Sequence, residues 1–280
     1  MSADVTDLAS GKGHKDENFP VASMLLKPEH RAPIMAFYRF ARSADDVSDH
    51  PTAAAHEKLA RLAHIRNGLE GEGAAEAMAL GKVMRERELD PIHAHDLLDA
   101  FVQDVTINRY ADWDSLIGYC RLSAMPVGRF VLDVHGEDRA VWPLSDALCA
   151  ALQIINHLQD CAKDYRELDR VYLTADALAA TGADISDLAA DTATPALLGT
   201  IRATAASTQD LLRTSAPFAS AIRDRRLAVE VAIIQRLAED LTRRLTARDP
   251  LSERVHHSTA EAAWLAARAA LGQLFARRRR

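Results

Sequence analysis

Two pairs of aspartates, each at the end of an apolar segment with helical periodicity, constrain the fold of this chain more than any other feature. Each pair shares one face of a helix with nearby polar side chains, because residues three or four apart are neighbours on a helix surface. The first set is Tyr38, Arg42, Asp45 and Asp49, and the second is Gln153, Asn156, Asp160 and Asp164. Two such faces brought together would form a divalent-metal site.

The donor atoms in these two sets favour Mg²⁺. Neighbouring carboxylates on one helical face repel each other, so each pair costs the helix stability unless a cation neutralises it. Aspartate oxygens without cysteine or histidine ligands suit Mg²⁺ better than zinc. Since Mg²⁺ held by a few carboxylates keeps positions for water and phosphate oxygens, the pattern predicts a diphosphate ligand.

A solvated helix face is the alternative interpretation of each pair, because a chain with 40 acidic residues contains many such faces. The segments before the pairs argue against it. Residues 33–41 and 147–152 are apolar enough to be core helices. An uncompensated charge in a buried helix is costly, so the acids of these helices need partners.

The composition excludes several classes of protein. The chain has 280 residues, 48% of them hydrophobic, and no apolar run of transmembrane length, which favours a globular protein. Its acidic, polar N-terminus is unlike a secretory signal, so we expect a cytoplasmic location. The net charge of −6 argues against a nucleic-acid partner. The three cysteines show neither a disulfide set nor a CxxC pattern.

Hydrophobic periodicity predicts helices through almost the whole chain and no sheet, hence an all-α fold. The pattern favours one domain over residues 18–276, with a flexible lead at residues 1–17 and a basic tail at residues 277–280. Residues 181–195 have the weakest pattern and are expected to form a flexible loop.

Two prolines are expected to interrupt helices. Pro28 should end or bend a helix that begins near Phe19, and Pro126 should kink a helix that runs on to Phe130. Gly128 lies just after the second proline and would permit a close approach of another element.

The C-terminal segment has two interpretations that stay open. Residues 262–276 are apolar and are followed by Arg277–Arg280. Such a helix could lie on an anionic membrane surface, or it could be a packed last helix with a frayed tail.

The ordered motifs resemble the squalene/phytoene synthase family, whose members have an all-α isoprenoid synthase fold with a central cavity. The resemblance covers most of residues 14–175 and rests on the segments 37–49, 119–128, 153–164 and 170–173. Within the family it points to the branch that acts in bacterial hopanoid biosynthesis, which the segments 17–23, 38–42 and 126–132 resemble.

The resemblance implies a role for each matching residue. It implies Mg²⁺ binding by Asp45, Asp49, Asp160 and Asp164. It implies a catalytic group around the diphosphate, formed by Tyr38, Arg42, Tyr119 and Asp104. It implies substrate contacts from Phe37, Asn18, Gln153, Asn156, Gln159, Arg170 and Tyr172. The expected substrate is a prenyl diphosphate, and contacts with other enzymes of the same pathway stay open.

Two departures from the family pattern bear on the reaction. Family members that condense two prenyl diphosphates carry Ser-x-Ser-Phe near the start and an arginine before the second motif, where this chain has residues 16–19 (DENF) and Gln159. Fewer diphosphate-binding groups favour a single diphosphate substrate. The resemblance therefore implies Mg²⁺-dependent conversion of presqualene diphosphate and water to hydroxysqualene and diphosphate. The alternative is head-to-head condensation of two prenyl diphosphates, with or without reduction by NADPH.

Overall fold

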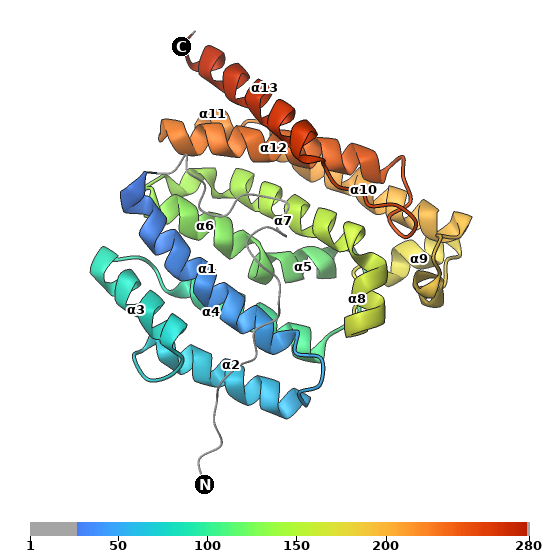
Figure 1. The fold of residues 1–280 in the computed structure, drawn as a ribbon, viewed down its shortest axis with the longest axis horizontal. Helices are drawn as coiled ribbons and strands as arrows, with labels where there is room; N and C mark the ends of the chain where they lie inside the picture. The colour runs from blue at the N-terminus through green and yellow to red at the C-terminus, as the bar shows by residue number, and fades with distance from the viewer. Residues whose placement is uncertain (1–26, 279–280) are drawn as a thin grey trace.

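The computed structural model describes residues 27–278, which form helices joined mostly by short connections, with a longer one at residues 246–258 (Figure 1). The first half contains α1 (Pro28–Ser48), α2 (Ala55–Leu69), α3 (Ala75–Arg87), α4 (Ile92–Thr106), α5 (Trp113–Ser123), α6 (Met125–Val134) and the 3₁₀ turn η1 (Arg139–Val141). The second half contains α7 (Trp142–Gln159), α8 (Cys161–Leu168), α9 (Ala175–Thr181), the 3₁₀ turn η2 (Ile185–Ala189), α10 (Pro195–Ser215), α11 (Phe218–Ala221), α12 (Arg225–Leu245) and α13 (Thr259–Arg278).

The all-α prediction is confirmed. Between residues 27 and 278 no strand occurs, and the β-type pairing there is an isolated bridge between Arg109 and Val171. The predicted lead at residues 1–17 lies outside the described residues. At the other end, α13 continues to Arg278, so the helix extends two residues into the predicted basic tail.

Both prolines begin helices. Pro28 is the first residue of α1, where its missing N–H costs nothing because the first N–H groups of a helix have no intrahelical acceptor. The helix that was expected to begin near Phe19 and to end or bend at Pro28 lies outside the described residues. Pro126 lies in the first turn of α6, and the expected kinked helix is two helices that meet at Ala124 (φ −123°, ψ −45°).

The spacing of the second aspartate set predicted one continuous helix, but the set spans two helices. α7 ends at Gln159 and α8 begins at Cys161, with Asp160 at the junction in a non-helical conformation (φ −102°, ψ 8°). The positive φ of Asp169 (52°) then turns the chain out of α8. The Arg170 N–H donates to the Asp164 carbonyl at 3.1 Å and closes this turn.

The segment 181–195 is more regular than its composition indicates. It contains η2, in which Leu188 is fully buried. The Thr194 hydroxyl donates to Asp187 Oδ2 at 3.0 Å and joins η2 to the start of α10. One buried leucine thus holds a stretch that periodicity alone could not assign.

Two long helices carry the aspartate sets into the centre of the molecule. α1 packs against α2, α3, α4 and α6, whereas α7 packs against α5, α6, α10 and α12. α6 contacts both α1 and α7, so the two helices lie on either side of a shared interior (Figure 1). α13 packs on α12, on the opposite side from α7 (Figure 1).

The predicted close approach at Gly128 is present between α6 and α7. A Cβ atom at Gly128 would lie 2.5 Å from Cys149 Sγ and 2.5 Å from Ser145 Oγ, both on α7. These distances are well inside van der Waals contact, so any side chain at this position forces the two helices or their side chains apart.

Gly128→Ala is expected to lower the free energy of unfolding by about 1–3 kcal/mol, the usual cost of overpacking a core. Urea unfolding would measure it. Gly118→Ala is the matched control, because Gly118 lies inside α5 and an added Cβ meets nothing within 4 Å. Alanine there should stabilise the protein by up to about 1 kcal/mol through helix propensity. Equal effects of the two substitutions would contradict the close packing of α6 on α7.

Candidate active site

A cavity of about 350 Å³ brings the two aspartate sets together. Its walls come from α1, α4, α5, α6, α7 and α8 and from the segment that follows α8. Twelve of the residues singled out from the sequence line it: Tyr38, Arg42, Asp45, Asp49, Asp104, Tyr119, Gln153, Asn156, Asp160, Asp164, Arg170 and Tyr172. The structure thus brings together the residues assigned to metal, diphosphate and catalysis, whose roles stay predictions.

Three predicted substrate-binding residues lie elsewhere. Phe37 is buried beside this cavity and stacks on Phe130, with ring centroids 4.2 Å apart. Gln159 is buried and its side-chain amide donates to the Val255 carbonyl, so it connects the end of α7 to the segment before α13. Asn18 lies outside the described residues.

Two arginines neutralise part of the acidic lining. Arg170 Nη1 donates to Asp49 Oδ1 at 2.6 Å, which ties the segment after α8 to the end of α1. Arg42 donates to Asp45 Oδ2 at 2.9 Å and also pairs with Asp46 at 2.8 Å. Asp46 does not line the cavity and acts on it through Arg42.

The charges of the lining suit a hard cation with several free coordination positions. Five aspartates line the cavity, against the two guanidinium groups of Arg42 and Arg170. Within residues 27–278, no three acidic, histidine or cysteine side chains lie close enough to hold one ion by themselves. Mg²⁺ fits this arrangement, since it binds through one or two carboxylates and completes its octahedron with water and phosphate oxygens.

Asp104 is the buried acid of the cavity. The Tyr119 hydroxyl donates to Asp104 Oδ2 at 3.1 Å, and Oδ1 is buried without a hydrogen-bond partner among the described residues. Burial raises the pKa of the Asp104 carboxyl to about 7, although the Arg170 charge and the Tyr119 hydrogen bond oppose the shift. A second polar cavity of about 330 Å³ meets the first at Asp104, Leu168 and Arg170.

His157 is a site residue that the sequence did not single out. Its ring stacks on Tyr172 with centroids 3.3 Å apart, and its Nε2 lies 3.0 Å from Gln153 Nε2. Its Nδ1 lies 3.7 Å from Asp164 Oδ2. The available signal was its position four residues after Gln153, which places both side chains on one face of α7.

An apolar cavity of about 440 Å³ adjoins the polar one. The two share Tyr38, Ala41, Val127, Gln153 and Asn156 as lining residues. The far end of the apolar cavity is formed by side chains of α6, α7, α11 and α12. The site is therefore a charged chamber that continues into a predominantly apolar one, whose lining also includes the buried Glu230.

Helical walls, facing aspartate sets and an adjoining apolar chamber define an all-α isoprenoid synthase. Residues 12–261 match the model of the squalene/phytoene synthase family. The chain belongs to the squalene/phytoene synthase family and is an enzyme of it. The family membership that the motifs predicted is thereby confirmed.

Two relatives of high sequence similarity are both named hydroxysqualene synthase. The chain is 55% identical to the hydroxysqualene synthase of Zymomonas mobilis subsp. mobilis over 96% of this chain and 92% of the relative. It is 53% identical to the hydroxysqualene synthase of Rhodopseudomonas palustris over 90% of this chain and 87% of the relative.

Solved structures show the same fold. A squalene synthase from Alicyclobacillus acidocaldarius is 29% identical, with a TM-score of 0.71 over 80% of this chain and 86% of that one. A dehydrosqualene synthase bound to a ligand has a TM-score of 0.73 at 19% identity, over 91% of this chain and 90% of that one.

Asp104→Asn is expected to stabilise the folded protein, most strongly at alkaline pH. The folded pKa is about 7 and the unfolded value about 4, so the folded state pays an increasing cost as pH rises from 4 to 7. Asparagine removes that cost, which is at most about 4 kcal/mol above pH 7. Urea unfolding at pH 5 and pH 8 would measure the difference. Asp191→Asn is the control, because the Asp191 side chain is fully exposed. A pH-independent gain would contradict a buried, ionising Asp104.

Proposed function

We propose that this enzyme converts presqualene diphosphate and water to hydroxysqualene and diphosphate in a Mg²⁺-dependent reaction. The observation that carries the proposal is the continuity of the aspartate-lined chamber with the apolar cavity, which matches a diphosphate head on a long hydrocarbon. The names of the two relatives above 50% identity support the same reaction.

The polar chamber binds the leaving group. Asp45 of α1 and Asp49, which caps the end of α1, line the chamber together with Asp160 and Asp164 of the α7–α8 region. These carboxylates would hold Mg²⁺, which when bound neutralises charge on the departing diphosphate. Arg42 and Arg170 line the same chamber, and Arg170 also orients Asp49 through their ion pair.

The apolar cavity holds the hydrocarbon and excludes bulk water. Phe37 and Phe130 stack in its wall, and Tyr38 lies where the two cavities join. Aromatic faces stabilise nearby cationic carbon by electrostatic attraction to the ring. A carbocation formed at the junction is thereby kept from random capture by solvent.

Asp104 is the proton acceptor that we assign to water capture. Loss of diphosphate breaks the C–O bond and leaves a carbocation; water then forms the new C–O bond and must lose one proton. Asp104 Oδ1 is buried with no other partner in the described chain, and its neighbour Tyr119 fixes the other oxygen. The second polar cavity reaches the same carboxyl and offers water a path that avoids the apolar cavity.

The number of cationic groups favours one diphosphate over two. Among the described residues that line the polar chamber, the arginines are Arg42 and Arg170, and no lysine is present. Condensation of two prenyl diphosphates would place a second diphosphate in the same acidic chamber. That reaction is the alternative outcome of the experiment below.

The purified enzyme with Mg²⁺ and without NADPH should form hydroxysqualene from presqualene diphosphate and no product from farnesyl diphosphate. Mass spectrometry identifies the products. Asp45→Asn and Asp160→Asn should each lower kcat/KM by roughly 100-fold or more, since each removes a metal-binding carboxylate. Asp191→Asn, at a fully exposed site, should leave it unchanged. Presqualene diphosphate or a phytoene-like product formed from a simple prenyl diphosphate would establish the condensation instead.

The rate of hydroxysqualene formation should rise with pH through an apparent pKa of about 7, because Asp104 must be ionised to accept the proton. Asp104→Asn should lower kcat by roughly 100-fold or more and abolish this limb of the profile. Steady-state rates from pH 5.5 to 9 would measure both. An Asp104→Asn enzyme with the wild-type pH profile would exclude Asp104 as the acceptor.

A further inference from the structure

The last helix carries its large apolar side chains on the side that faces solvent. Trp264, Leu271 and Phe275 are 56%, 55% and 58% exposed, and Leu274 is 51% exposed. The side packed on α12 buries Leu265 and Gln273 and is otherwise built of small residues. An ordinary surface helix has the opposite arrangement, with apolar residues packed and polar residues outside.

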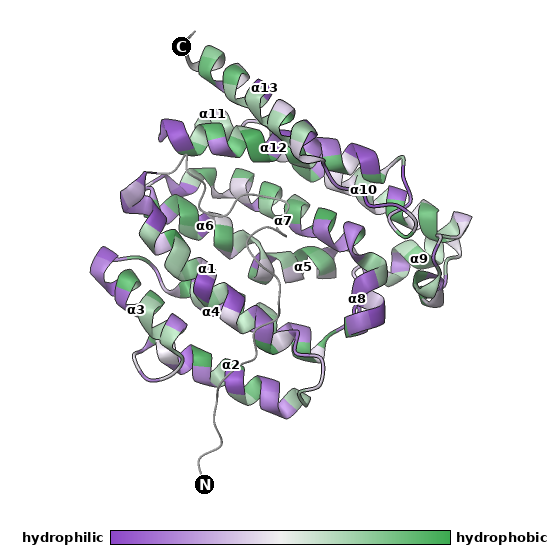
Figure 2. Cartoon of the chain, in the orientation of Figure 1, coloured by the Kyte–Doolittle hydropathy of each residue, from purple (hydrophilic) through white to green (hydrophobic). Residues whose placement is uncertain are grey.

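The exposed residues form a continuous stripe. Trp264, Leu271 and Phe275 are separated by seven and four positions, so they lie on one face of the helix, with Arg268 between the first two. The Arg268 guanidinium lies over the Trp264 ring at 4.6 Å. Figure 2 shows the predominantly hydrophobic colouring of α13.

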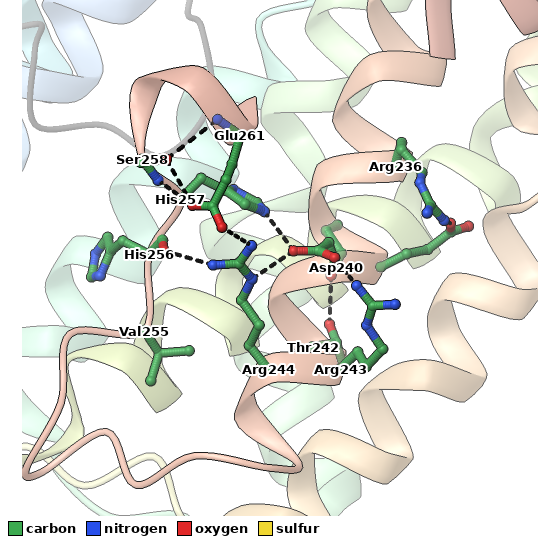
Figure 3. Close-up of polar contacts among 12 residues, drawn as sticks. Arg236, Asp240, Thr242, Arg243, Arg244, Val255, His256, His257, Ser258 and Glu261 are labelled. Carbon is green, nitrogen blue, oxygen red and sulfur yellow. Dashed lines mark hydrogen bonds and ion pairs between the residues drawn. The ribbon is translucent and has the colours of Figure 1, made fainter. Parts of the chain in front are cut away.

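A dense polar network fixes α13 to the protein at its first turn (Figure 3). The buried Asp240 of α12 accepts from Arg244 Nε at 2.6 Å and lies 3.0 Å from His257 Nε2. Arg244 Nη2 donates to Glu261 Oε1 at 2.9 Å. Farther along, Gln273 Nε2 donates to the Ala219 carbonyl at 2.9 Å. The apolar stripe is therefore presented on an anchored helix.

The charge of this segment is opposite to that of the whole protein. Residues 262–280 contain five arginines and no acid, whereas the chain as a whole has a net charge of −6. The acid of α13, Glu261, is paired with Arg244. An apolar stripe that ends in a basic run is complementary to a surface that is anionic outside and hydrocarbon beneath.

We infer that α13 docks the enzyme on the surface of an anionic phospholipid bilayer. Trp264, Leu271, Leu274 and Phe275 enter the boundary between headgroups and acyl chains, and the positive charge of the segment favours anionic headgroups. No helix among residues 27–278 is long and apolar enough to cross a membrane, so the contact is made along the helix.

Docking through α13 would also place the apolar cavity on the side of the enzyme that faces the bilayer. Leu227, Val231 and Ile234 of α12 line that cavity, and α13 packs on the same helix. Both α12 and α13 then separate the cavity from the bilayer surface, a distance of about two helix diameters, roughly 20 Å. This consequence rests on the proposed function, since a hydrocarbon substrate and product would partition into the bilayer.

Other occupants of the stripe fit less well. A second copy of the chain would bring two arginine-rich helices against each other. A nucleic acid would leave the exposed leucines and phenylalanine without a partner. An acidic protein partner would need its own apolar groove and is tested as an outcome below.

Sedimentation of the full-length enzyme with vesicles tests the inference. The enzyme should bind phosphatidylglycerol-containing vesicles, bind pure phosphatidylcholine vesicles weakly, and lose binding at high salt. The double substitution Leu271→Asp with Phe275→Asp should weaken binding by roughly tenfold or more, since it removes two buried apolar side chains. Replacing Arg277–Arg280 with glutamine should weaken binding to the anionic vesicles alone.

Two exposed apolar residues on other helices provide the matched control. Met78 of α3 and Ile92 of α4 are 40% and 45% exposed, and aspartate at both should leave vesicle binding unchanged. Tryptophan fluorescence gives a local readout, because Trp264 is one of three tryptophans. Vesicles should shift the emission to shorter wavelength in the wild type but not in Trp264→Phe.

Several results would overturn the inference. They are absence of binding to anionic vesicles, binding that the α13 substitutions leave intact, and a dimer in ultracentrifugation that the same substitutions dissociate. Capture of an acidic protein without any vesicle binding would also overturn it.

Turnover of detergent-dispersed presqualene diphosphate should be equal in the wild type and the α13 variants. Vesicle binding does not depend on turnover, so failure of the proposed reaction would be recognised separately.

Discussion

The concentration of negative charge in the central cavity is the constraint on which the rest of the site depends. Five carboxylates from α1, α4 and the α7–α8 region line one space, and like charges in a partly buried space repel strongly. Two arginines offset part of that charge, and one of them, Arg170, is almost completely buried. Its ion pair with Asp49 joins segments far apart in the chain. The negative charge that the arginines leave unneutralised can bind a cation together with an anionic substrate.

Two local backbone features determine the positions of the charged side chains in the cavity. Asp160 interrupts the helix between α7 and α8, so Asp164 projects from a separate, short helix. Asp169 adopts a left-handed conformation, which ends α8 and directs Arg170 back toward α1. The same turn brings Val171 beside Arg109 in an isolated bridge. The backbone conformations of Asp160 and Asp169 thus determine where the aspartates and Arg170 come together.

α12 connects the apolar part of the site with the molecular surface. Its inner side lines the apolar cavity, and α13 covers another side of it. Asp240, a buried acid on α12, secures the start of α13 through Arg244 and His257. His257 therefore has a structural role at the start of α13. One helix thus serves both the hydrocarbon chamber and the exposed apolar stripe.

The sequence by itself determined the all-α fold, the family and most of the cavity lining, because helical spacing puts Asp45 and Asp49, or Gln153 and Asn156, on one face whatever the rest of the chain does. Only the tertiary structure decided the break at Asp160, the burial of Asp104 and the place of His157 against Tyr172. It also directed the Gln159 side chain to Val255, away from the cavity. These outcomes depend on contacts between segments distant in sequence, and periodicity carries no information about such contacts.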